Sequence, residues 1–150
     1  MATLEIYDAG STNLYSPVSK SNPLPIGQVT VLPTGAIAVT ASSGNQANTA
    51  AIAILPGVAG KTTYLTGYSF TGGGATAAAL VSPTIAGLLG GTATFTYGVV
   101  AGVTSANAPL AAVVNHPMPA SAANTAIVAT LPALGLGNTN ATVVLHGFQL

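Results

Sequence analysis

The sequence predicts an all-β protein: an antiparallel β-sandwich, jelly-roll-like, with an extended N-terminal arm and hairpin. Short apolar runs recur about every ten residues and are separated by Gly, Pro and Asn, which is typical of sandwiches. Several runs alternate apolar and polar residues, as half-buried strands do. Cys and Trp are both absent, which excludes an immunoglobulin domain built on an inter-sheet disulfide and a buried Trp. Other immunoglobulin-like sandwiches stay open beside the jelly roll.

Residues 1–47 are predicted to form the arm and hairpin. They hold four of the ten prolines and three of the four charged residues. Pro23-Leu24-Pro25 cannot continue a helix and favours an extended path. Residues 28–32 and 36–40 are predicted strands on either side of a turn at Pro33-Thr34-Gly35, which together would make one hairpin.

Residues 48–150 are predicted to form the sandwich. The candidate strands are 49–55, 62–71, 77–88, 92–100, 109–116, 125–131 and 141–149. The stretch 92–99 alternates most cleanly, so its threonines are expected to face outward. The residues expected to face inward there are Ala93, Phe95, Tyr97 and Val99. In 62–71 the same rule places Tyr64, Tyr68 and Phe70 on one face.

The chain is almost uncharged. Only 3% of its residues are charged and its net charge is zero, against roughly 25% charged residues in an ordinary soluble domain. Electrostatic attraction to nucleic acid or to an anionic membrane is therefore not expected. A monomer with so little charge is poorly protected against self-association, so we expect other protein molecules to cover much of its surface. The alternative is a monomer that Thr, Ser, Asn and Gln keep soluble.

Gly60-Lys61-Thr62 matches the end of a phosphate-binding loop. The complete motif needs a glycine five residues before the second one, but position 55 is Leu, and Gly57 is too close. No strand–helix–strand unit surrounds the fragment. A turn between two strands, with Lys61 solvated, explains it better.

The chain also lacks the groups that enzymes use. Glu5 and Asp8 are its only carboxylates, and at this spacing in a strand they would point to opposite faces. Acid–base catalysis needs titratable groups, so the prediction is no enzymatic activity, no catalytic residue and no cofactor. His116 and His146 are too few for a zinc site within one chain. Three copies of one His on a threefold axis would make a site, whereas a hydrogen-bonded interface or core His is the ordinary interpretation.

Four residues of the arm are candidate partner-binding residues: Tyr7, Tyr15, Leu24 and Ile26. Aromatic anchors are common where one protein docks on another. Packing of Tyr7 and Tyr15 back onto their own sandwich is the equal alternative.

Four segments resemble those of small tailed-bacteriophage virion proteins, namely TGYSFTGGGAT (66–76), ASAANTAIV (120–128), GLGNTNA (135–141) and LHGF (145–148). The group they resemble is the capsid decoration, or cement, proteins. The resemblance covers residues 60–150 and carries over no individual functional residue. It implies a jelly-roll or related sandwich, a homotrimer seated on the major capsid protein, and no enzymatic activity.

The start of the chain lacks the basic and apolar regions of a signal peptide. The most apolar run, 75–91, is interrupted by Ser82-Pro83-Thr84 and is too dilute to span a membrane. We therefore expect synthesis in the cytoplasm, and the resemblance to decoration proteins implies a host cell and a final location on the capsid exterior. Two other classes remain open: a tail or fibre module that recognises a host glycan or protein, and a small sandwich enzyme or carbohydrate-binding domain.

Overall fold

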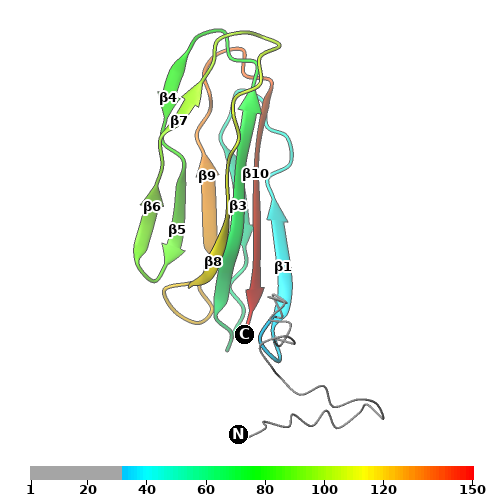
Figure 1. Ribbon diagram of the computed structural model, residues 1–150, viewed down its shortest axis with the longest axis vertical. Helices are drawn as coiled ribbons and strands as arrows, with labels where there is room; N and C mark the ends of the chain where they lie inside the picture. Colours follow the sequence, from blue (N-terminus) through cyan, green and yellow to red (C-terminus); the bar gives the residue numbers. More distant parts are fainter. Residues whose placement is uncertain (1–31) are drawn as a thin grey trace, which may run out of the picture. The chain divides into compact units, whose positions relative to one another are not determined.

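Ten β-strands make up the part of the chain that the computed structural model describes, residues 32–150 (Figure 1). No helix occurs within that range. The strands are β1 (Ile37–Ser42), β2 (Ala51–Leu55), β3 (Thr63–Gly73), β4 (Ala79–Val81), β5 (Thr84–Leu88), β6 (Gly91–Thr94), β7 (Tyr97–Val99), β8 (Leu110–Pro119), β9 (Ile127–Leu131) and β10 (Asn140–Gln149). The prediction of an all-β chain is confirmed for these residues.

All strand pairs are antiparallel, and they form two four-stranded sheets and one small sheet. The first sheet has the order β1-β10-β3-β8, and the second has the order β2-β9-β5-β6. The small sheet pairs β4 with β7. It continues the β5–β6 pair lengthwise, because β4 runs into β5 and β6 runs into β7 (Figure 1).

The core lies between the two four-stranded sheets, consistent with a β-sandwich. Strands of the first sheet contribute the fully buried Leu65, Phe70 and Leu145, and strands of the second contribute Leu55 and Ile127. Burying apolar area contributes about 25 cal/mol per Å². The inward-facing apolar side chains of the strands therefore supply the main stabilisation.

The alternation predicted for residues 92–99 is confirmed. Tyr97 and Val99 are buried, and Ala93 and Phe95 pack against the core cluster. The intervening threonines are exposed.

Two of the predicted strands are each broken in the middle. The run 77–88 divides into β4 and β5 at Ser82-Pro83, because proline lacks an N–H for the ladder. Its partner, 92–100, divides opposite this point into β6 and β7. The Phe95 amide donates to the Pro83 carbonyl at 2.9 Å, which keeps the two halves together across the break.

The turn at Pro33–Gly35 forms as predicted, with the Ala36 amide donating to the Pro33 carbonyl at 2.9 Å. The strand that follows it, β1, pairs along its whole length with β10. The segment that the sequence analysis grouped with the arm is therefore an edge strand of the first sheet. Residues 28–31 of the predicted hairpin lie outside the described residues, and Leu32 is not in a strand.

The prediction that Tyr64 shares the inward face of Tyr68 and Phe70 is wrong. The pairing register of β3 shifts between Leu65 and Gly67 against β8, and a matching shift occurs in β10 at His146/Gly147. A bulge exchanges the faces of all residues beyond it. Leu65 is therefore buried in place of Tyr64, whose ring stacks on Phe148 at 4.8 Å.

Candidate interaction surface

Lys61 stands at the end of a tight turn rather than in a phosphate-binding loop. Its amide donates to the Val58 carbonyl at 3.0 Å, and its carbonyl accepts from the Asn124 amide at 2.9 Å. Gly57 lies against the Asn124 carbonyl so closely that no side chain would fit there. The backbone amide and carbonyl of Lys61 are thus both committed to protein contacts, as in a turn between two strands.

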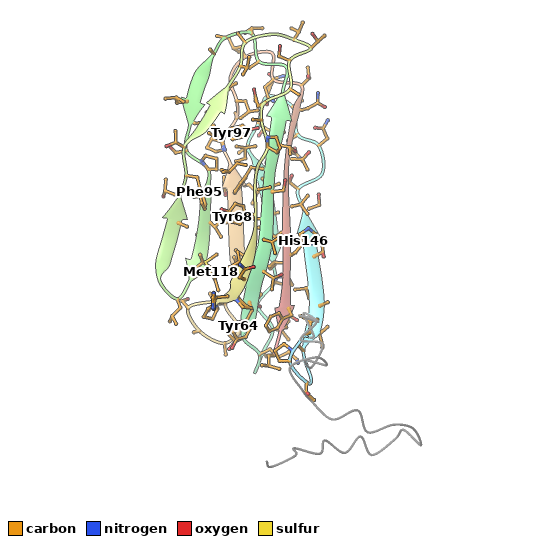
Figure 2. The ribbon with its side chains drawn as sticks, in the orientation of Figure 1. Tyr64, Tyr68, Phe95, Tyr97, Met118 and His146 are labelled. Carbon is orange, nitrogen blue, oxygen red and sulfur yellow. The ribbon has the colours of Figure 1, made fainter. Side chains whose placement is uncertain are left out.

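The two histidines lie on different strands, and both are exposed. His116 is in β8, and His146 is in β10 with its Nδ1 3.4 Å from the Thr40 hydroxyl. His146 is therefore not a core residue (Figure 2). Across residues 32–150, no three His, Cys, Asp or Glu side chains gather closely enough to hold a metal ion.

Tyr97 and Asn107 form a buried polar pair between the small sheet and the β7–β8 connection. The Asn107 side-chain oxygen accepts from the Val100 amide at 2.8 Å. Neither the Tyr97 hydroxyl nor Asn107 Nδ2 has a hydrogen bond of good geometry. Burial raises the pKa of Tyr97, while the adjacent Asn107 side chain and Gly72 backbone partly oppose that rise. The Asn107 side chain and the Gly72 backbone thus lower the pKa of the Tyr97 hydroxyl, although neither is aligned for a hydrogen bond with it.

We expect Tyr97→Phe to change the free energy of unfolding at neutral pH by less than about 1 kcal/mol, because the hydroxyl it removes has no good partner.

The raised pKa of Tyr97 predicts that the free energy of unfolding depends on pH in the alkaline range. Unfolded tyrosine loses its proton near pH 10, before folded Tyr97 does, so wild-type stability falls as the pH rises above 10. Urea unfolding at pH 8 and pH 11 should show a smaller loss in Tyr97→Phe. Equal losses in both proteins would contradict this assignment.

An open groove of ≈ 680 Å³ runs beside the buried pair, between the small sheet and the start of β8. Its lining is mostly aliphatic and includes Leu80, Val99 and Leu110. No charged side chain lines it. The groove therefore offers mainly apolar contact and backbone groups, with Thr96 and Tyr97 as its polar side chains.

Among residues 32–150, strand β8 is one of the two edge strands of the first sheet, and its first half is unprotected. Ala111, Ala112 and Val113 are exposed, with Val113 at 85%. Natural edge strands are usually guarded by charged residues, prolines or bulges. In β8 the only such guards are Pro117, Pro119 and a register shift in its second half. Leu110–Val113 is therefore open to pairing with another chain.

Exposed aliphatic side chains are spread over the sandwich. The same surface carries almost no charge. Eleven large hydrophobics are exposed among the described residues: Leu32, Ile37, Ile52, Ile54, Leu80, Leu89, Val100, Val103, Val113, Leu136 and Leu150. Lys61 is the one charged side chain in residues 32–150. The sequence analysis missed Ile52 and Ile54 as surface residues, because AIAIL is apolar on both faces and alternation cannot say which face is inside.

The predicted partner-binding residues Tyr7, Tyr15, Leu24 and Ile26 lie outside the described residues, as do Glu5, Asp8 and Lys20. Of the tyrosines inside them, Tyr97 is buried in the core, Tyr68 packs against the core, and Tyr64 stacks on Phe148 on the outward face. The described residues contain no helix of the length and apolarity needed to cross a membrane.

Across residues 32–150, fold and surface together define a class: a small antiparallel β-sandwich whose exterior carries almost no charge. A scan of protein-family models finds no match to the chain. Searches of curated proteins and of solved structures find no match either.

Proposed function

We propose that this chain is a structural virion protein of a tailed phage, which binds and stabilises the capsid shell as a head decoration, or cement, protein. In this proposal it acts as a homotrimer on the major capsid protein, at the capsid exterior, and it has no enzymatic activity. The observation that carries the proposal is the combination of eleven exposed large hydrophobics with a single charged side chain in residues 32–150. A folded domain with so little charge is poorly protected against association, which favours contact with other protein surfaces.

The strand order supports a jelly roll as the finer fold. Eight main strands remain when β4 and β7 are taken as continuations of β5 and β6. The first of these pairs with the last (β1–β10), the second with the seventh (β2–β9), the third with the sixth (β3–β8) and the fourth with the fifth (β5–β6). Such nesting results when one long antiparallel hairpin is rolled into two sheets. Jelly rolls of eight strands are common in viral capsid proteins, and also in lectins.

The mechanism we propose relies on many weak contacts. Uncharged aliphatic and threonine side chains lose little hydration when another neutral surface covers them. Each buried Å² contributes about 25 cal/mol before the costs of association. Symmetry repeats these contacts around the shell, so their effect accumulates by avidity. The arm, with Tyr7, Tyr15, Leu24 and Ile26, would lie across a neighbouring subunit and add backbone hydrogen bonds at a sheet edge.

The arm is tested by deletion of residues 1–31. This boundary leaves β1 intact, whereas a deletion to residue 45 would remove an edge strand that pairs with β10. We expect the shortened protein to keep its thermal unfolding midpoint within a few degrees but to lose at least tenfold in affinity for phage heads prepared without the protein. Co-sedimentation with those heads measures the affinity. Normal binding by the shortened protein would exclude the arm from the contact.

Electron microscopy of labelled full-length protein on complete particles tests the location. Many copies over the head are expected. A few copies at the tail would instead support a receptor-binding module that recognises a host glycan or protein.

A further inference from the structure

The two outer faces of the sandwich differ in chemistry. Residues that lie opposite each other in neighbouring strands form rows across each sheet. On the first sheet two outward rows are Ser42-Val144-Ser69-Ala111 and Thr40-His146-Gly67-Val113. A third row, beyond the bulge, is Ala38-Phe148-Tyr64-Pro119. The first two rows mix serine, threonine and histidine with alanine and valine, as on the solvated side of an antiparallel sheet, whereas the third is largely aromatic.

The outer face of the second sheet is built from β-branched and aliphatic side chains. Its rows are Ile52-Thr130-Thr84-Thr94 and Ile54-Val128-Ala86. Ile52 and Ile54 are 48% and 50% exposed, although each stands where a solvated sheet usually carries a polar residue. Their inward neighbours in β2, Ala51, Ala53 and Leu55, are fully buried or nearly so. The orientation of β2 is therefore fixed, and within residues 32–150 about half of each isoleucine side chain stays uncovered.

The same face continues over the small sheet. Burial keeps alternating across the breaks, since Pro83 and Tyr97 are buried and Ser82 and Thr96 are exposed. Leu80 and Val100 therefore lie on the outward side, 77% and 53% exposed, and they also border the open groove. We call this continuous surface the isoleucine face; it comprises Ile52, Ile54, Leu80, Thr84, Ala86, Thr94, Val100, Val128 and Thr130. No charged residue belongs to it.

We infer that a second copy of this chain packs on the isoleucine face. The occupant must be uncharged, because a charged partner would lose hydration there without gaining an opposite charge. Another isoleucine face meets this requirement and is always present at the same concentration. Pairing of two such faces is twofold and gives a dimer, so it is a different contact from the one that would close the proposed trimer. Ile, Val and Thr also lose little side-chain freedom on burial, because β-branching already restricts χ1. Flat sheets stack face to face at about 10 Å, the spacing found inside sandwiches.

The size of the face is adequate for such a contact. Strands about 4.8 Å apart that rise about 3.3 Å per residue give it roughly 450 Å² of flat area. Two copies would then remove on the order of 1,000 Å² from water, near the lower limit for a specific interface. This inference concerns purified protein alone and does not require capsid binding, so either proposal can fail without the other.

The test introduces lysine on one face at a time. Ile52→Lys/Ile54→Lys places two charges on the isoleucine face, in an edge strand that tolerates lysine. The matched control, Thr40→Lys/Thr71→Lys, adds the same charge to exposed outward positions of the first sheet. Light scattering over a concentration series should show an oligomer for wild type and control, and at least tenfold weaker association for the Ile variant. The same measurement gives the number of copies. Circular dichroism confirms that each variant is folded.

Cysteine cross-linking tests the same contact if the lysine variant fails to fold. The chain has no cysteine, so Ile54→Cys introduces its only thiol, and Thr40→Cys gives the matched control. A short bismaleimide should link Ile54→Cys protomers covalently and leave the Thr40→Cys variant unlinked at equal concentration. A wild-type monomer at tens of micromolar would overturn the inference. So would equal weakening by both lysine pairs, or equal linking of both thiols.

Discussion

Gly87→Ala will lower the free energy of unfolding by at least about 3 kcal/mol, a large part of the 5–15 kcal/mol typical of a domain. Gly87 lies at the register shift in β5, where its φ is +86°. An L-residue is strained at this angle. A Cβ atom there would also overlap the Ala126 carbonyl oxygen, which is backbone and cannot rotate away. The mutant must therefore separate β5 from the loop that precedes β9.

Three other glycines separate the two causes. Gly91 has φ +98° and open space around its Cβ position, so Gly91→Ala measures backbone strain alone. Gly57→Ala measures overlap alone, because the added Cβ meets the Asn124 carbonyl without a positive φ. Gly90→Ala has neither problem. Urea unfolding at one protomer concentration should rank Gly87→Ala as the most damaging and Gly90→Ala as nearly neutral. A Gly87→Ala protein as stable as Gly90→Ala would refute the bulge as a structural requirement.

Phe70→Ala will destabilise the sandwich by about 3–5 kcal/mol, the range for truncation of a buried aromatic residue. The Phe70 side chain is fully buried and belongs to an aromatic group in which Tyr68 and Phe95 lie 5.7 and 6.1 Å away, centroid to centroid. Its removal leaves a cavity between the two sheets, because a strand cannot collapse inward without breaking its ladder.

Phe95→Ala is the matched control for Phe70→Ala. Phe95 is in the same aromatic group, 5.2 Å from Tyr68, but it is half-buried in the break between β6 and β7. Water can fill part of the space that its side chain leaves, so we expect a clearly smaller loss. Unfolding midpoints measured at equal protomer concentration compare the two variants, since association would otherwise shift them. Losses of the same size would contradict the burial argument.

The positions of most strands were predictable because their signal is local. Period-two alternation in Thr92–Val99 and the Gly and Pro residues between runs mark a strand without reference to any partner. Where the signal failed, a long-range contact was responsible. Tyr64 changed face because of a bulge that β3 shares with β10, and nothing in residues 62–71 alone announces it. β1 joined β10, more than 100 positions away in the sequence, rather than standing apart from the sandwich.

For the candidate surface, the low charge was predictable from the sequence, but the residues that form the isoleucine face were not. Scarcity of charge is a property of composition, and it led to the prediction of contact with other proteins before any strand was placed. The isoleucine face could not be found in this way, because Ala51–Leu55 is apolar at every position.

By itself, the sequence determined the all-β class, the strand positions and the uncharged exterior. These follow from side-chain periodicity and composition, which each short segment carries independently. Tertiary structure alone decided the order of the strands, the exchange of faces at the bulge and which isoleucines lie outside. Those features depend on pairing between distant segments, and the free energy of such pairing belongs to no single stretch of the chain.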